Sequence, residues 1–188
     1  WSRFWLVDPL DGTKEFIKRN GEFTVNIALV EEDKTSFGVV FAPVQEELYV
    51  GIQGRGAFLC TNPKNFLQPL DYLLQFADKL PLYQPESPEF RVVASRSHYN
   101  EETAEFVESL ESVEKEVQLV SRGSSLKLCM VASGAADIYP RLGPTMEWDT
   151  AAAHAVVKAM GKNVYRVDNG EELSYNKEDL LNPYFVVK

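Results

Sequence analysis

The sequence predicts an α/β protein, in which an antiparallel sheet is followed by strands that alternate with helices. Residues 1–60 contain four short segments rich in β-branched and aromatic residues, separated by turn residues, as in an antiparallel meander. After residue 90, short apolar strands alternate with helical segments, which indicates an α/β layer. A chain of 188 residues with 45% hydrophobic residues is long enough to bury a core. We therefore expect a sheet part over residues 1–83 and an α/β part over residues 84–188.

The first part opens directly on a segment with the composition of a strand. Trp1–Val7 is rich in aromatic and β-forming residues, and the turn residues over 8–13 are expected to break this strand. A helical turn should follow over Lys14–Arg19. The other strands are expected at Phe23–Val30, Ser36–Phe41 and Glu47–Ile52, with tight turns at Gly51, Gly54 and Gly56.

Residues 61–90 hold five of the ten prolines, which predicts a linker or surface excursion with a short helix near Asp71–Phe76. In the second part, amphipathic spacing and terminal glycines predict three helices. They are Glu101–Leu110, Ser124–Ser133 and Asp149–Met160. Strands are expected at Arg91–Ala94, Glu116–Val120, Ala136–Tyr139, Asn163–Val167 and Tyr184–Val187.

The charge and cysteine content exclude several classes of protein. Nineteen Lys and Arg residues against 28 Asp and Glu residues give a formal net charge of −9, which argues against binding to a nucleic acid polymer. Cys60 and Cys129 form no paired motif, so neither a disulfide framework nor a cysteine-rich zinc site is expected. No apolar run has the length of a membrane span, and the first residues lack the pattern of a signal peptide. We expect a cytoplasmic protein, whose only contact with the inner membrane would be peripheral.

Two carboxylates in the first turn are candidates for chemistry. Asp8 and Asp11 directly follow a strand and, with the Leu10 carbonyl as a third oxygen, suit a hard divalent cation. On its own, such a pair is more often two turn-forming residues in solvent. Gly12 and Thr13 favour the functional interpretation, because a helix start beside the pair offers N–H groups to a phosphate. A cation next to an oxyanion site is what phosphoryl transfer requires.

A third carboxylate, Asp149, stands at the expected start of the last helix. Asp is a favoured N-cap residue, so a purely structural role explains it equally well. Alternatively, it is a third metal ligand, since the small side chains of Ala151 and Ala152 would let this helix end approach the site closely. The local sequence does not decide between a cap and a ligand.

These segments resemble a known superfamily. Asp8–Thr13 (DPLDGT) and Trp148–Ala152 (WDTAA) resemble the two signatures of the inositol monophosphatases, which are lithium-sensitive, magnesium-dependent phosphatases. The stretch over residues 5–30 is similar to one branch, the bacterial 3′(2′),5′-bisphosphate nucleotidases. Further motifs of this branch follow in order, with SRSH at 95–98, GSSLK at 123–127, PRLGPT at 140–145 and WDTAAAHAV at 148–156. The resemblance implies the layered α/β sandwich of the sugar-phosphatase fold.

The resemblance also implies a role for each matching position. The metal ligands would be Asp8, the Leu10 carbonyl, Asp11 and Asp149, holding two or three Mg²⁺ ions in the complete enzyme. The catalytic set would be Asp8, Asp11, Thr13 and Asp149. The substrate-binding set would be Leu10, Asp11, Gly12, Thr13, Ser95, His98, Gly123, Lys127 and Asp149. In this set, Lys127 would hold the non-scissile phosphate or ribose, with Arg141 as a weaker candidate. Cys129 is expected to be a small core residue, and His154 is expected to pack in the fold or lie at the surface.

One part of the family pattern is absent from this sequence. The resemblance implies a glutamate ligand upstream of the DPLDGT motif, on a segment that also carries two long helices and a hairpin. No glutamate here matches it, and Glu15 and Glu22 lie after the motif and are not assigned to that role. We therefore expect an N-terminally truncated form of the fold, which could itself be inactive.

The implied reaction is the hydrolysis of adenosine 3′,5′-bisphosphate to AMP and phosphate, in sulfur assimilation and nucleotide recycling. The partner would be this small nucleotide. No cysteine or serine is set against a base in the sequence, so no covalent phospho-enzyme is expected. One alternative is an inositol or sugar monophosphatase of the same superfamily. Another is an inactive fragment that binds only metal or a partner.

Overall fold

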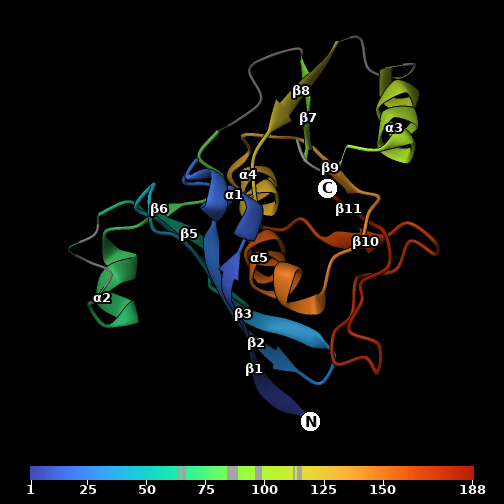
Figure 1. The fold of residues 1–188 in the computed structure, drawn as a ribbon. Helices are drawn as coiled ribbons and strands as arrows, with labels where there is room; N and C mark the ends of the chain where they lie inside the picture. The colour runs from blue at the N-terminus through green and yellow to red at the C-terminus, as the bar shows by residue number, and fades with distance from the viewer. Residues whose placement is uncertain (63, 65–66, 84–88, 96–98, 112, 114–115) are drawn as a thin grey trace.

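The largest element of the computed structural model is a six-stranded antiparallel sheet, whose strands lie side by side in chain order (Figure 1). The structure describes residues 1–62, 64, 67–83, 89–95, 99–111, 113 and 116–188. The strands of this sheet are β1 Arg3–Asp11, β2 Thr24–Glu31, β3 Lys34–Ala42, β4 Glu47–Ile52, β5 Gly56–Cys60 and β6 Asp78–Lys79. The predicted meander is therefore confirmed, with two further strands at its far edge.

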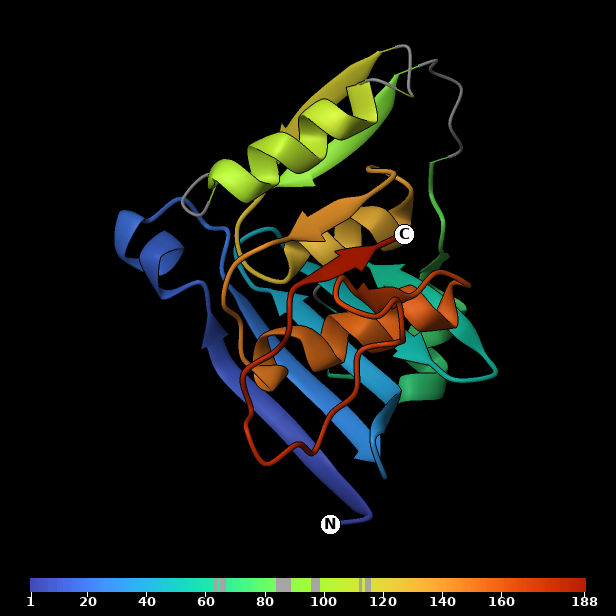
Figure 2. The ribbon, with the colours of Figure 1, turned by 90° about the vertical axis from the view of Figure 1, so that its right-hand side faces the viewer.

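Two helices cover the inner face of this sheet and separate it from a second set of strands (Figure 2). These helices are α4 Leu126–Ser133 and α5 Glu147–Ala159. Beyond them lie the antiparallel strands β9 Tyr139–Arg141, β10 Val164–Arg166 and β11 Phe185–Val187, and the parallel pair β7 Phe90–Ala94 and β8 Val117–Ser121. The other helices are α1 Thr13–Lys18, α2 Leu70–Gln75 and α3 Glu101–Glu111. This order of sheet, helices and strands is the layered sandwich that the resemblance implies.

The core lies mainly between the six-stranded sheet and α4 and α5. On β2, the even-numbered residues from Thr24 to Val30 are buried and the odd-numbered ones are partly exposed, as the two-residue period of a strand requires. The main apolar cluster joins residues of both parts of the chain, such as Val40 of the sheet, Val156 of α5 and Phe185 of β11. None of the helices that the structure describes is long and apolar enough to cross a membrane.

Helix α5 approaches the sheet closely because two glycines of the sheet lie beneath it. A Cβ atom at Gly51 would lie 2.5 Å from the carbonyl oxygen of Ala155 and from the nitrogen of Val156. A Cβ atom at Gly38 would collide with the Ala152 carbonyl oxygen. Since both obstacles are helix backbone, neither can move aside without moving the helix. These contacts fix the height of α5 above the sheet.

Two predicted strand boundaries are wrong, and two strands of the sheet were not predicted. The strand β1 is not broken after Val7 but continues to Asp11, with an irregularity in its pairing to β2 that accommodates Pro9. The strand predicted at Ala136–Tyr139 begins only at Tyr139, because the preceding N–H groups of Ala136 and Asp137 donate to the carbonyls of Met130 and Arg91. The strands β5 and β6 lie in segments interpreted as turns and linker. The predicted helix near Asp71–Phe76 is confirmed by α2.

We expect Gly51→Ala to lower the free energy of unfolding by about 1–3 kcal/mol, as overpacking in a closely packed interior does. Gly143→Ala is the matched control, because the nearest atom to its added Cβ would be 4.0 Å away. Urea denaturation of both variants measures the difference. Equal stability of the two variants would contradict the close approach of α5.

Candidate active site

A β-bulge in β1 turns two carboxylates toward the same face of the sheet. Asp8 pairs with Asn26 and Asp11 with Thr24, so three steps along β1 correspond to two along β2. In a regular strand, residues three apart point to opposite faces, and the extra residue of a bulge removes this difference. Asp8 is only 9% exposed, and its carboxylate accepts a hydrogen bond from the Leu10 N–H at 3.0 Å.

The third carboxylate comes from the first turn of α5. The helix begins at Glu147 with Met146 as its N-cap, so Asp149 is the third residue of the helix and not the cap that the sequence suggested. Its Oδ2 atom accepts a hydrogen bond from the Met146 N–H at 2.7 Å. This is the reaching-back contact of a capping box. Asp149 therefore has a structural contact through one oxygen while its carboxylate also faces the two carboxylates of β1.

The three carboxylates form one cluster. Asp8, Asp11 and Asp149 each place a carboxylate oxygen within 4.8 Å of those of the other two. Burial raises the pKa of all three. For Asp11, the charge of Lys127 opposes this effect and the charges of Asp149 and Asp8 add to it, which leaves its pKa at about 6. Oxygen ligands in this number suit a hard divalent cation, whose charge would relieve the repulsion between them.

Polar neighbours hold Asp11 in place from the opposite side. The Ser125 N–H, at the start of α4, donates to Asp11 Oδ2 at 2.6 Å. The hydroxyl of Ser125 lies 2.8 Å from both the Thr24 hydroxyl and the Asn26 amide oxygen, and all three residues are buried. The Gly123-Ser124-Ser125 turn before α4 therefore gives its Ser125 amide to a carboxylate.

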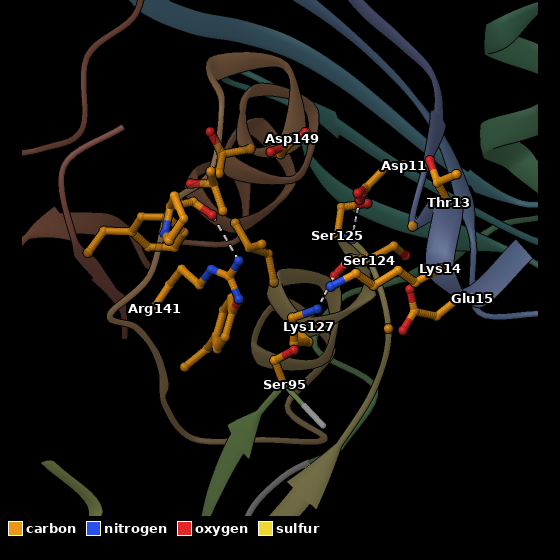
Figure 3. Close-up of a pocket in the computed structure, with 18 residues that line it drawn as sticks. Asp11, Thr13, Lys14, Glu15, Ser95, Ser124, Ser125, Lys127, Arg141 and Asp149 are labelled. Atoms are coloured by element: carbon orange, nitrogen blue, oxygen red, sulfur yellow. Dashed lines mark hydrogen bonds between the residues drawn. The ribbon is translucent and has the colours of Figure 1, made fainter. Parts of the chain in front are cut away.

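Two cationic side chains lie below the carboxylates in the same pocket (Figure 3). Lys127 is 6% exposed and its Nζ donates to the Ser124 carbonyl at 2.6 Å, while burial lowers its pKa to about 8. Arg141 is 8% exposed and donates from Nη2 to the Pro144 carbonyl at 2.9 Å. Its buried Nε has no hydrogen-bond partner among the residues that the structure describes. Buried cations with few partners favour an anionic ligand.

The remaining wall of the pocket comes from α1 and the turn before it. Gly12 adopts a left-handed conformation with φ +86°, and its carbonyl accepts the Phe16 N–H at 2.9 Å, which starts the short helix. This turn directs Thr13, Lys14 and Glu15 along the wall beside Asp11 (Figure 3). The pocket has a volume of about 260 Å³.

Most of the residues selected from the sequence meet at this pocket. The lining includes Asp11, Gly12, Thr13, Ser95, Gly123, Lys127, Arg141 and Asp149. Asp8 adjoins it through the carboxylate cluster, and Leu10 contributes the N–H that holds Asp8. His98 lies outside the described residues. Cys129 is fully buried in the core, as expected, and His154 is buried as well, which decides for packing over a surface position.

Sequence reasoning missed several residues of the site. Lys14, Glu15 and Ser124 line the pocket, and Ser125 holds Asp11. Glu15 and Glu22 are both 9% exposed, and the Glu22 carboxylate lies 3.7 Å from Arg122. The sequence Gly123-Ser124-Ser125 at the expected start of a helix was the signal that indicated a turn there. Nothing in the sequence indicated that its amide would meet Asp11.

A comparison with known families matches the inositol monophosphatase family over residues 1–187. The chain belongs to the inositol monophosphatase family. Enzymes of this family are metal-dependent phosphatases, and the carboxylate cluster of this member fits a metal. The chemistry of the site and the family thus agree.

Individual relatives support this assignment. The chain is 47% identical to the 3′(2′),5′-bisphosphate nucleotidase CysQ of Salmonella typhimurium over 188 residues, which is the whole chain and 68% of that relative. The crystal structure of CysQ from Bacteroides thetaiotaomicron superposes with a TM-score of 0.95 at 49% identity, covering 100% of this chain and 70% of the other. The Thermotoga maritima IMPase has a TM-score of 0.72 at 24% identity, with 100% and 64% covered, and shares the fold.

We expect metal binding to weaken as the pH falls through about 6. Burial raises the pKa of Asp11 to about that value, so a proton competes with the metal below it. Titration calorimetry with Mn²⁺ at several pH values would measure the affinity, which should level off above neutrality. An affinity that is constant between pH 5 and pH 7 would contradict a site built on Asp11.

The same pKa shifts predict how the metal-free protein responds to pH. A carboxyl whose pKa is higher in the folded than in the unfolded state stabilises the fold only while protonated, so its contribution is lost as the pH rises from about 4 through about 6. Asp11→Asn should flatten this part of the profile of unfolding free energy against pH. An unchanged profile would contradict the assigned pKa.

Proposed function

We propose that this protein hydrolyses adenosine 3′,5′-bisphosphate to AMP and phosphate, with Mg²⁺ as its cofactor. The observation that carries the proposal is the pairing, in one pocket, of a carboxylate cluster with the buried cations Lys127 and Arg141. These two groups of side chains suit the two phosphates of a bisphosphate. The carboxylates would bind one phosphate through a metal ion, and the cations would bind the other by direct charge pairing. The name of the similar Salmonella enzyme, a 3′(2′),5′-bisphosphate nucleotidase, supports the same substrate class.

Asp8, Asp11 and Asp149 would hold the metal. Their fit to a divalent cation rests on geometry, because each of the three offers a carboxylate oxygen within 4.8 Å of the other two. When bound, a divalent cation lowers the pKa of a coordinated water and offsets charge on the phosphate. The Leu10 carbonyl is proposed as a further ligand. Li⁺ is expected to inhibit at the same site.

The chain's own groups orient the reactants. The Ser125 N–H, the Thr24 hydroxyl and the Asn26 amide all lie against the Asp11 carboxylate. This carboxylate is therefore already oriented before the substrate binds. Thr13 lies on the wall beside Asp11, where its hydroxyl is proposed to orient the attacking water. Together with Gly12, it is proposed to contact the scissile phosphate.

The second phosphate is assigned to Lys127 and Arg141. Arg141 keeps a buried Nε without a partner among the described residues, and the described contacts of Lys127 Nζ are the Ser124 carbonyl and the Tyr139 ring. A phosphate here would satisfy both donors and raise the lowered pKa of Lys127. Ser95 and Gly123 line the same region and are proposed to contact the nucleotide. His98 is proposed to join them.

An inositol or sugar monophosphatase is the second candidate. The carboxylate cluster would serve it equally well, because the metal acts on a single phosphate in either case. Such a substrate has no second phosphate, so it leaves the buried cations unexplained. The remaining alternative is an inactive fragment that binds only a metal. It would explain the carboxylate cluster but gives no role to Lys127 and Arg141.

We expect Asp149→Asn to abolish most of the turnover with little loss of stability. Asparagine retains an oxygen that can accept the Met146 N–H, so the helix start is preserved, whereas the negative charge on the metal is lost. Phosphate release and the melting temperature, measured on the same preparation, separate the two effects. Retained turnover with a collapsed melting temperature would make Asp149 a capping residue alone.

We expect Lys127→Ala to lower kcat/KM for adenosine 3′,5′-bisphosphate roughly ten- to a hundredfold. This is the effect of losing one charge-assisted hydrogen bond of about 1.5–3 kcal/mol. Hydrolysis of inositol 1-phosphate should be nearly unchanged. Lys158→Ala is the matched control, since Lys158 is ion-paired to Glu172 and does not line the pocket.

An equal loss on both substrates would contradict the assignment of Lys127 to the second phosphate. A preference of the unmodified protein for inositol 1-phosphate would overturn the nucleotidase assignment.

A further inference from the structure

The first turn of α5 is held by a segment from near the C-terminus. Residues 174–182, here called the clamp segment, form no helix or strand of their own. At one end of this segment, the N–H groups of Asn176 and Lys177 donate to the carboxylate of Glu147 at 2.9 and 3.1 Å. Lys177 Nζ binds the same carboxylate at 2.5 Å, and Glu147 is only 1% exposed.

At its other end, the clamp segment contacts the peptide group that binds Asp149. The N–H of Asn182 donates to the Thr145 carbonyl at 2.8 Å. This carbonyl and the N–H of Met146 belong to one peptide unit, which is planar and turns as a whole. Since the Met146 N–H donates to Asp149 Oδ2 at 2.7 Å, Asn182 holds one end of the peptide whose other end holds Asp149.

The side chain of Asn182 holds the next peptide as well. Its Nδ2 donates to the Met146 carbonyl at 2.8 Å and lies 3.2 and 3.1 Å from the hydroxyls of Thr145 and Thr150. A carbonyl can only accept a hydrogen bond, so this contact fixes which end of the amide faces α5. Asn182 is buried, with only 4% of its surface exposed. Asn182 therefore contacts both peptides flanking Met146, the first through its main-chain N–H and the second through its side chain. The N–H of the second peptide, from Glu147, also donates to the Leu180 carbonyl at 2.9 Å.

We propose that Asn182 is a positioning residue for the metal site, acting on Asp149 through the Met146 peptide. The inference rests on the proposed role of Asp149 as a metal ligand. Asn182 does not line the pocket, and it touches neither Asp149 nor a reacting group directly. Its Nδ2 holds the Met146 carbonyl, which also accepts the Asp149 N–H at 3.1 Å, so loss of the side chain loosens the contact that aligns Asp149 with Asp8 and Asp11.

The alternative is that Asn182 only stabilises the fold. Asn163 provides a matched control for this possibility, because it also contacts α5, at the end far from the site. Its Oδ1 lies 2.7 Å from His154 Nε2 and accepts the Val164 N–H at 2.9 Å. Removal of either asparagine side chain should lower the melting temperature, but only one of them is linked to Asp149.

The test is titration calorimetry with Mn²⁺ alone, on the unmodified protein and on Asn182→Ala, Asn163→Ala and Asp149→Asn, with melting temperatures recorded in parallel. We expect Asn182→Ala to weaken Mn²⁺ binding by about tenfold or more, the usual effect of losing a partner that orients a ligand. Asn163→Ala should bind as the unmodified protein does. Asn182→Asp, whose side chain fills the same space but has no N–H to donate to the Met146 carbonyl, should reproduce the loss.

Each outcome decides the proposal. Unchanged binding in Asn182→Ala, or equal weakening in Asn182→Ala and Asn163→Ala, would overturn it while leaving the metal site intact. Failure of both Asn182 variants to fold would make the residue structural and also overturn it. If Asp149→Asn binds Mn²⁺ as the unmodified protein does, the metal site of the proposed function is wrong, and the positioning role falls with it.

Discussion

One extra residue in β1 brings the two carboxylates of that strand to the same face of the sheet. Without the bulge between Asp8 and Asp11, the two-residue period of the strand would direct them to opposite faces. Pro9 is compatible with this irregularity because it has no N–H to contribute to regular pairing. The contact from the Ser125 N–H to Asp11 and the meeting of both carboxylates with Asp149 depend on this local departure from a regular strand.

The three carboxylates of the site repel one another, and the surrounding structure keeps them close together despite this repulsion. Three carboxylates with raised pKa values meet within a few ångströms, and burial is the largest cause of each shift. Backbone donors offset part of this repulsion, from Leu10 to Asp8, from Ser125 to Asp11 and from Met146 to Asp149. Each carboxylate thus accepts a hydrogen bond from one main-chain N–H group, and this bond orients it. The close seating of α5 on Gly38 and Gly51 then prevents Asp149 from moving away.

Much of this arrangement could be predicted from the sequence. The alternation of apolar residues predicts the meander, and the DPLDGT and WDTAA motifs select all three carboxylates before any geometry is known. The bulge could not be predicted, because Asp8-Pro9-Leu10-Asp11 has the composition of an ordinary turn. Asn182 also had no local signal. Its contacts reach residues more than thirty positions away, and neither periodicity nor a motif connects them.

The central claim is that Asp8, Asp11 and Asp149 together bind a divalent cation. Anomalous diffraction from crystals grown with Mn²⁺ tests it most directly, because the map locates the metal without reference to activity. The account predicts a peak about 2.1 Å from a carboxylate oxygen of each of the three residues, the usual distance for a small divalent cation. A map without a peak among them, or with its only peaks bound elsewhere on the protein, would contradict the account.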